Sequence, residues 1–355
     1  MRTLVLERGA LKNNLSVIKD RAGGAVIYGV LTGDGGGAGT AAMALLLRDA
    51  GIGRFAVSEV GEAETIRKAG LVDEEILMLR PTTDREELQR LVDLGVVCTV
   101  SSVDTGLALN ALAGERSTVA EAHIQVDTGM GFGGFLAGEP EKILLAYRSL
   151  PNVALSGIYT QLHAARPNDP ETHQQLELFQ QILHSIHAAG FETGTVHAAG
   201  SYALLHDDEA RLDGVRVGSA LLGRCRRTRD DGLKTVGYGE APLSEVRWLP
   251  KGHTLGADKP IVLKRPTRVA VLPVGYLNGY GVTRPRESGF WAMVRRWKKS
   301  RRRTVRLGDQ RARLLGPIGA TETLLDVTNL KCSAGDLAVF EMDPLYARGF
   351  TVELR

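Results

Sequence analysis

The sequence has no long apolar run and few cysteines, and these absences exclude several classes of protein. Its apolar stretches, such as residues 43–47 and 269–272, are far too short to cross a bilayer. The chain does not open on an apolar stretch with a cleavage site, which predicts no signal peptide. Cys98, Cys225 and Cys332 are too widely separated for a disulfide framework or a metal cluster. These features predict a cytoplasmic protein.

The composition is that of an ordinary globular protein, with 43% apolar and 24% charged residues. It excludes disordered and fibrous classes. A chain of 355 residues exceeds the usual size of a single core. We therefore expect either one large barrel with an appended part or two domains.

The charge is unevenly distributed along the chain. Residues 295–313 carry ten basic side chains and one acid, Asp309, which gives +9 for this segment. The whole chain carries +3, so the remainder carries −6. The basic segment is therefore a local feature of a mildly acidic protein.

Short β-branched runs alternate with amphipathic stretches over about residues 25–220. Eight strands separated by helices are typical of a (β/α)₈ barrel, whose chemistry lies at the C-terminal ends of the strands. The expected strands are residues 25–31, 54–58, 75–80, 96–101, 120–127, 154–162, 195–199 and 215–221.

After about residue 230 the helical spacing ends and short β runs separated by Gly and Pro follow. We expect three parts: residues 1–10 as a strand that pairs with the C-terminal domain, 11–232 as the barrel, and 233–355 as a β-rich domain with a basic insertion at 286–304. The fold class is thus α/β, a (β/α)₈ barrel plus a β-rich C-terminal domain.

A glycine-rich stretch, residues 33–39, follows the first barrel strand. It fits either a flexible loop at the barrel mouth or a turn whose backbone N–H groups hold an anion. It does not match the nucleotide-binding P-loop pattern.

Three further strand ends carry polar groups: Asp127-Thr128-Gly129, His197 to Ser201, and Arg216 with Gly218. A serine at a helix start is by default only a cap. Three such features at neighbouring strand ends favour a phosphate site. A fourth motif, Val274 to Gly279, holds Tyr276 between glycines in the β-rich part.

The ordered motifs DTGMG, HAAGS, VRVG and VGYLNG, with the opening ALKNNLSVIK, resemble those of the alanine racemase family. The resemblance spans nearly the whole chain. It implies a barrel with a C-terminal β domain, homodimeric assembly and the cofactor pyridoxal phosphate (PLP).

The sequence departs from the family pattern at several positions. The lysine that forms the Schiff base with PLP is matched by Tyr28. Further family residues are replaced by Thr32, Asp34, Gln125, Phe132, Gln161, Gly200 and Ala320-Thr321. Between Lys19 and Lys234 only Lys68 and Lys142 occur, both in expected outer helices. A phenol cannot form the imine that PLP chemistry needs, so we expect no covalent cofactor and no PLP-dependent racemisation.

Other family residues are retained. The resemblance implies that Arg216 faces the pyridine nitrogen and that Tyr276 is a racemisation base reaching across the dimer interface. An anion or phosphate pocket would use Ser201, Arg216, Gly218, Ser219, Tyr346 and Thr32. The alternatives are that Tyr276 is buried structurally at the interface and that Arg216 pairs with an acid inside the barrel.

Two functional hypotheses follow. The first is a degenerate, non-racemase homologue with a binding, regulatory or scaffold role. The second is an enzyme of altered chemistry that uses Tyr276, Tyr28, Asp34 or His163 on a small amino acid, with PLP held non-covalently or absent. The missing lysine favours the first hypothesis, and retained Tyr276 and Arg216 keep the second open.

Residues 290–303, which overlap the basic segment, mix aromatic and cationic residues at helical spacing. They fit a solvated loop, a helix on an anionic membrane surface at the inner membrane face, or a contact to an acidic protein. Nucleic acid is the least favoured partner because no recognition fold accompanies the charge. The candidate partner-binding residues are Trp291, Arg295, Arg296, Trp297, Lys298, Lys299, Arg301, Arg302 and Arg303.

Overall fold

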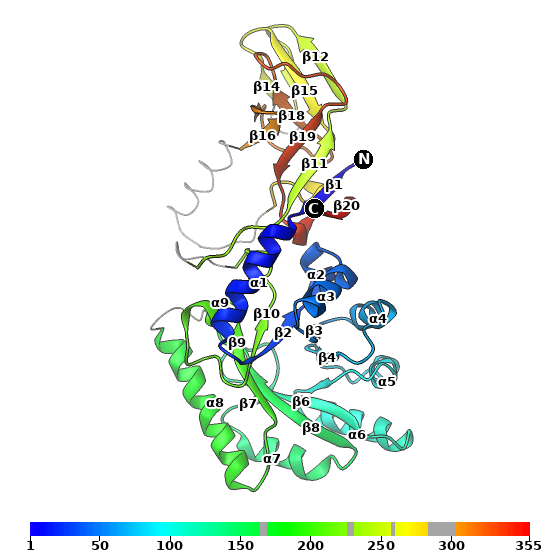
Figure 1. Cartoon of the computed structure of the whole chain (residues 1–355), viewed down its shortest axis with the longest axis vertical. Coiled ribbons are helices and arrows are strands. Elements are labelled where there is room, and N and C mark those ends of the chain that lie inside the picture. The colour runs from blue at the N-terminus through cyan, green and yellow to red at the C-terminus, as the bar shows by residue number, and fades with distance from the viewer. Residues whose placement is uncertain (164–168, 226–230, 257–259, 283–302) are drawn as a thin grey trace. The chain divides into compact units, whose positions relative to one another are not determined.

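The computed structural model describes residues 1–163, 169–225, 231–256, 260–282 and 303–355. The chain divides into two compact units (Figure 1). One comprises Gly9–Thr235, and the other Met1–Arg8 together with Val236–Arg355. None of the helices in these described ranges is both long and apolar enough to cross a membrane.

The first unit is a nearly closed parallel barrel of eight strands. The strand order is β4-β3-β2-β10-β9-β8-β6-β5, and a parallel bridge between Leu77 and Val97 joins the two ends. This confirms the expected barrel. Its strands are β2 Val26–Val30, β3 Arg54–Val57, β4 Glu75–Met78, β5 Cys98–Val100, β6 Ala120–Asp127, β8 Val153–Thr160, β9 Thr195–Gly200 and β10 Gly214–Val217. A short strand, β7 Phe135–Leu136, pairs with β6.

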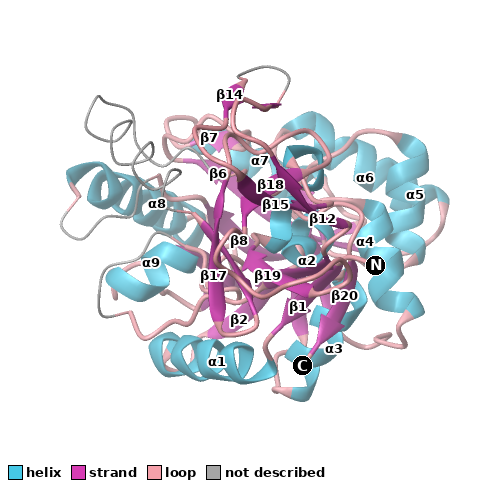
Figure 2. Ribbon diagram, turned by 90° about the horizontal axis from the view of Figure 1, so that it is seen from above, coloured by secondary structure: helices cyan, strands magenta, loops and turns pink. Residues whose placement is uncertain are grey.

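Helices form the outer layer of the barrel unit (Figure 2). Several begin at side-chain caps: Asp84 accepts from the Glu87 amide before α5, and Ser102 accepts from the Thr105 amide before α6. The helices are α1 Arg8–Ala22, α2 Thr32–Gly37, α3 Thr40–Asp49, α4 Val60–Lys68, α5 Arg85–Asp93, α6 Val103–Glu115, α7 Pro140–Ser149, α8 Pro170–Ala188 and α9 Ser201–His206.

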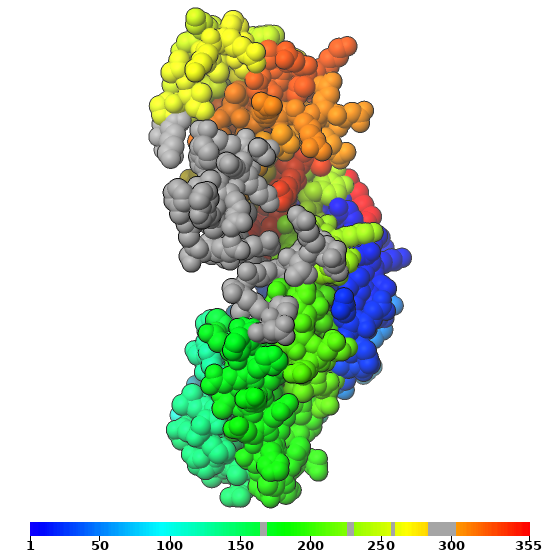
Figure 3. All heavy atoms as spheres, turned by 90° about the vertical axis from the view of Figure 1, so that its left-hand side faces the viewer, coloured from blue at the N-terminus to red at the C-terminus, as the bar shows by residue number. Residues whose placement is uncertain are grey.

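The longest helix, α8, belongs to the green stretch that covers one face of the barrel unit in the space-filling view (Figure 3). It buries Leu176, Phe179, Ile182 and Ile186, which recur every three to four residues along one side. This spacing produces the amphipathic pattern visible in the sequence. The buried face of α8 is thus mainly apolar, with the polar Thr172 and Gln175 near its start.

The expected last barrel strand, residues 215–221, ends earlier than its apolar run. Strand β10 stops at Val217, because the amides of Gly218 and Ala220 donate to the Ser201 hydroxyl instead of to a neighbouring strand. The polar turn that follows is part of the barrel mouth.

The second unit is built on a nine-stranded sheet in the order β12-β15-β18-β17-β16-β19-β11-β1-β20. The first strand of the chain, β1 Thr3–Leu6, runs antiparallel to β11 and parallel to β20. The other strands are β11 Tyr238–Pro242, β12 Glu245–Leu249, β15 Thr267–Leu272, β16 Thr304–Leu307, β17 Gln310–Leu314, β18 Thr323–Asp326, β19 Leu337–Glu341 and β20 Thr351–Leu354; β13 Thr254–Leu255 and β14 Ile261–Val262 form a separate pair.

Two glycines near β9 differ in what a side chain would meet. Both have positive φ, +65° at Gly194 and +83° at Gly190, but only at Gly194 would a Cβ lie 2.1 Å from the Ser156 carbonyl oxygen. We expect Gly194→Ala to lower the free energy of unfolding by about 3 kcal/mol and Gly190→Ala by about 1 kcal/mol. Urea unfolding of both variants measures the difference, and equal losses would contradict the clash.

Candidate functional site

The barrel interior contains a polar layer rather than an apolar one. Tyr28 on β2, His123 on β6, His197 on β9 and Arg216 on β10 are each at most 4% exposed. The register places Tyr28 beside Arg216 on the adjacent strand. Because alternate residues of a barrel strand face inward, these side chains meet at the centre of the barrel.

The hydrogen bonds in this layer fix the proton positions on both histidines. Arg216 Nη1 lies 2.6 Å from His197 Nδ1, and a guanidinium only donates, so Nδ1 accepts and the proton sits on Nε2. His197 Nε2 then donates to His123 Nδ1 at 3.0 Å. Burial, helped by the charge of Arg216, lowers the pKa of His123 to about 3 and the pKa of His197 well below its ordinary value. Both rings are therefore neutral at physiological pH.

Arg216 is a buried cation whose partners are all neutral. Its Nη2 donates to the Thr160 carbonyl at 2.6 Å and to Gln161 Oε1 at 2.9 Å, and its guanidinium lies 4.9 Å from the Tyr159 ring centre. No carboxylate of a described residue contacts it, so the alternative of an acid partner inside the barrel does not hold there. Burial lowers the pKa of Arg216 to about 10. The uncompensated charge favours an anionic ligand.

Tyr28 directs its hydroxyl toward the N-terminal ends of the strands. The hydroxyl donates to Glu75 Oε1 at 2.8 Å, and Glu75 forms an ion pair with Arg54. Glu75 and Arg54 are the first residues of β4 and β3, at the end of the barrel opposite the mouth. The ring stacks on His197 with 5.1 Å between centroids. Burial and the nearby Glu75 carboxylate raise the pKa of Tyr28 well above its ordinary value. The phenol is therefore a neutral donor.

Ser201 presents a hydroxyl at the C-terminal end of β9, next to Arg216. Its Oγ accepts from the amides of Gly218 at 3.0 Å and Ala220 at 3.2 Å. Gly200 on β9 pairs in register with Arg216 on β10. Ser201, the next residue, therefore lies beside β10 at the end of the strand pair. Since both lone pairs of Oγ are engaged, the hydroxyl hydrogen is left to donate to a ligand. A Cβ at Gly218 would lie 3.2 Å from Val30 Cβ, so this turn packs closely against β2.

The glycine-rich stretch forms a turn of left-handed backbone. Residues 33–36 have φ between 56° and 69°, a conformation that three of the four accept readily because they are glycines. The exception, Asp34, accepts from the Thr40 amide at 2.9 Å, and its own amide donates to Glu62 at 3.2 Å. Asp34 therefore holds the turn, and Thr32 begins it.

Two residues named as possible site residues, His163 and Tyr276, lie in exposed positions, and so does Phe132, which replaces a family arginine. Phe132 is 77% exposed on a loop whose amides at 129–131 donate to the Asp127 carboxylate. The His163 side chain lies on the surface with its Nδ1 3.4 Å from Glu171. Tyr276 is 51% exposed and, like Tyr346, belongs to the second unit.

Most of the expected partner-binding residues, 291–302, lie outside the described residues. Arg303 is described, and it donates to the Gly281 carbonyl at 3.1 Å. Ser219 lies in the turn after β10, and its carbonyl accepts from the Arg224 amide.

No sequence pattern assigned a role to His123, Tyr159 or Glu75, which the structure places around Tyr28 and Arg216. His123 and Tyr159 belong to expected strands, and Glu75 begins one. Counting alternate positions inward along these strands could have found the first two. The pairing of Tyr28 with Glu75 depends on strand register, which no local pattern carries.

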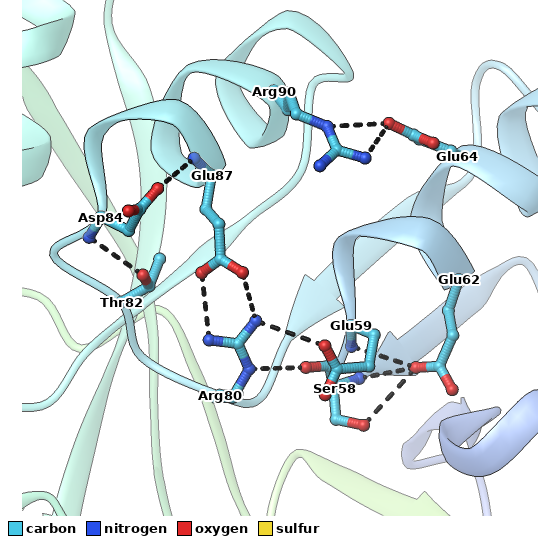
Figure 4. Close-up of polar contacts among 9 residues, drawn as sticks. All are labelled: Ser58, Glu59, Glu62, Glu64, Arg80, Thr82, Asp84, Glu87 and Arg90. Carbon is cyan, nitrogen blue, oxygen red and sulfur yellow. Dashed lines mark hydrogen bonds and ion pairs between the residues drawn. The ribbon is translucent and has the colours of Figure 1, made fainter.

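A second polar cluster lies just after β3 and β4 (Figure 4). Arg80 forms two hydrogen bonds to Glu87, a third to the Ser58 carbonyl and a fourth to Glu59. Glu62 accepts from the Ser58 and Glu59 amides. Arg80 is paired with two carboxylates and Glu62 is held by backbone amides, so these contacts brace the segments that lead into α4 and α5.

Comparisons with known proteins agree over both units. Residues 6–225 match the family model for the alanine racemase N-terminal domain, and residues 238–344 match the model for its C-terminal domain. An alanine racemase of Sorangium cellulosum is 32% identical over 340 residues, covering 93% of this chain and 85% of that protein. One of Geobacter is 27% identical over 354 residues, covering 96% and 88%.

Solved structures of alanine racemases share the fold. The one from a D-cycloserine-producing Streptomyces lavendulae aligns with a TM-score of 0.85 at 21% identity, covering 100% of this chain and 97% of that one. The one from Bartonella henselae, with covalently bound pyridoxal phosphate, aligns with a TM-score of 0.83 at 20% identity, covering 100% and 99%.

These comparisons overturn two expectations. A degenerate, non-racemase homologue was expected on the premise that Tyr28 replaces the family's lysine, but the curated relatives that match most of the chain are alanine racemases. The expectation of no covalent cofactor is contradicted for the same reason: the curated relatives are alanine racemases, and an alanine racemase structure of the same fold holds pyridoxal phosphate covalently. A substitution at the single position of Tyr28 is weaker evidence about function than the similarity to alanine racemases over both units.

The two buried histidines predict a pH-dependent stability. Their folded pKa values lie below the ordinary value of about 6.5, so only the unfolded chain takes up these protons between pH 7 and pH 5. The free energy of unfolding should therefore fall by about 2 kcal/mol per histidine over that range. His123→Gln should remove about half of this loss, whereas His184→Gln, on the exposed side of α8, should keep it. Urea unfolding at both pH values tests this, and an unchanged pH dependence in His123→Gln would refute it.

Proposed function

The chain belongs to the alanine racemase family, and we propose that it is an enzyme of that family that binds PLP and acts at the α-carbon of a small amino acid. The names of its relatives point to alanine as that amino acid. The observation that carries the proposal is the buried Arg216 cation without a carboxylate partner among the described residues, on the strand adjacent to the one that ends at Ser201, whose hydroxyl hydrogen is left to donate.

The phosphate end of PLP fits the residues at the mouth of the barrel. Ser201 has a hydroxyl hydrogen to donate, and Arg216 contributes an uncompensated positive charge on the next strand. The aldehyde end does not fit in the same way, because the eight barrel strands contain no lysine. The amine that holds the aldehyde therefore has to come from outside these strands.

We assign to Tyr28 the strand position at which the family carries its PLP-binding lysine. The support is the match of residues 26–35 to the family pattern after the first barrel strand. Tyr28 lies beside Arg216 in the register, and its phenol remains protonated because its pKa is raised. A protonated phenol bound to Glu75 orients His197 by stacking but removes no proton from a substrate at neutral pH.

We assign separate binding and proton-transfer roles to the remaining residues of the site. Neutral His197 and His123 hold the Arg216 guanidinium in place without competing for its charge. Ser201 binds the anionic group of the ligand. Tyr276, half exposed on the β-rich unit, moves the α-proton, and it does so in the barrel of a second copy of the chain. Electron withdrawal from the α-carbon is the chemistry that PLP supplies when bound.

The proposal predicts PLP binding that depends on Ser201. Ser201→Ala should weaken PLP binding about 10- to 100-fold, because a hydrogen bond to a charged group is worth roughly 1.5–3 kcal/mol. Ser185→Ala, on the surface of α8, is the matched control and should bind PLP as the unchanged protein does. Absorbance titration gives the affinity, and exchange of the α-proton of L-alanine for deuterium, followed by NMR, gives the activity. The proposal fails if the unchanged protein neither binds PLP nor exchanges that proton.

The assignment of position 28 predicts a gain of covalent attachment. After incubation with PLP and reduction with borohydride, Tyr28→Lys should carry the coenzyme's mass on residue 28, detected by peptide mass spectrometry. Because Glu75 would compete for the new amine, the double variant Tyr28→Lys/Glu75→Gln should show more complete labelling. Tyr28→Phe is the control and should show no label there. Absence of label at residue 28 in both lysine variants would rule out the assignment.

A further inference from the structure

We propose that Gln125 is a ligand-contact residue whose amide oxygen accepts a hydrogen bond from a hydroxyl or amine of the ligand in the barrel. The inference rests on the proposed function, since it concerns the same interior. The role of Gln125 follows from its amide oxygen, which has no hydrogen-bond donor among the described residues, and not from a sequence motif.

Gln125 lies inside the barrel near the mouth. It is on β6 two residues after His123, so it faces the same interior side one step closer to the C-terminal end of the strand. The residue is 9% exposed. Its Oε1 is buried and has no hydrogen-bond partner among the described residues.

The neighbouring glutamines show that this is not a general property of the site. Gln161 accepts from Arg216 Nη2 at 2.9 Å. Gln175 accepts from the His163 amide at 2.7 Å and donates to Thr128 and to the Gln161 carbonyl. Gln125 alone of these three has a buried amide oxygen without a donor.

A buried carbonyl oxygen without a donor destabilises the folded protein, and native proteins seldom keep one. A methionine would fill almost the same volume without that cost. The ligand-free protein thus carries an acceptor whose partner is missing. The terminal torsion of a glutamine is soft, so the amide can turn its oxygen toward an arriving donor at little cost.

The surroundings define the chemistry of that partner. The uncompensated charge of Arg216 attracts an anion, and Gln125 adds an acceptor for a neutral or cationic donor. The ligand that satisfies both carries a negative group together with a hydroxyl or an amine. Under the proposed function these donors are the ring hydroxyl of PLP and the amino group of the substrate amino acid.

The experiment compares the unchanged protein with Gln125→Met in two measurements. In the first, PLP and an analogue lacking the ring hydroxyl are titrated, and L-alanine binding is titrated to the PLP-loaded protein. In the second, the thermal midpoint is measured without ligand. Gln175→Met is the control, because it removes a buried amide whose bonds are all made within the protein.

We expect Gln125→Met to weaken binding of one ligand about tenfold while the ligand-free thermal midpoint stays equal or rises by about 2 °C. Loss of discrimination between PLP and its analogue assigns the donor to the ring hydroxyl. Weakened L-alanine binding alone assigns it to the amine. Gln175→Met should instead lower the thermal midpoint.

Three results would overturn the proposal. If the unchanged protein binds PLP but Gln125→Met binds PLP and L-alanine equally well, Gln125 has no ligand role and the proposed function stands. If ligand-free Gln125→Met is less stable, the amide is already satisfied within the folded protein, for instance by an internal water. If the unchanged protein does not bind PLP, the proposed function itself fails and this inference falls with it.

Discussion

The positive charge of Arg216, enclosed in the barrel without a carboxylate beside it, organises the rest of the site. Because a guanidinium can only donate, it dictates that His197 accepts at Nδ1 and that His123 accepts from His197. The same charge helps to keep both rings neutral by lowering their pKa values. Backbone carbonyls of β8 and β9 accept hydrogen bonds from the remaining N–H groups of the Arg216 guanidinium. The guanidinium is therefore held in place by several hydrogen bonds, and its positive charge remains without a carboxylate partner among the described residues.

Much of the fold could be predicted from the sequence because each barrel strand is marked by a short run of β-branched and apolar residues. Alternation of β-branched runs and amphipathic stretches located all eight strands, and residues 120–127 matched β6 to the residue. The polar strand ends at Ser201 and at Arg216 with Gly218 belong to neighbouring strands, as their order in the sequence suggested. The last strand was expected too long, because the pull of Ser201 on two amides is a contact between segments seventeen and nineteen residues apart.

What the sequence could not supply was the set of partners across the barrel. Tyr28 meets Glu75 forty-seven residues away, and His123 meets His197 seventy-four residues away. Such meetings depend on strand tilt and register, which only the closed sheet determines. The functional expectation failed for a different reason. It was argued from one substituted position, whereas the likeness to alanine racemases extends over both units of the chain.

The placement of β1 has a consequence for how the protein is made. This strand contains residues 3–6, yet it lies between β11 and β20, and β20 ends at residue 354. A ribosome therefore releases the first strand long before its last neighbour exists, while residues 9–235 can already close their own barrel. Until β11 has been synthesised, β1 has no partner in its sheet and is exposed to other nascent chains. Its second edge stays unpaired until β20 has also been synthesised.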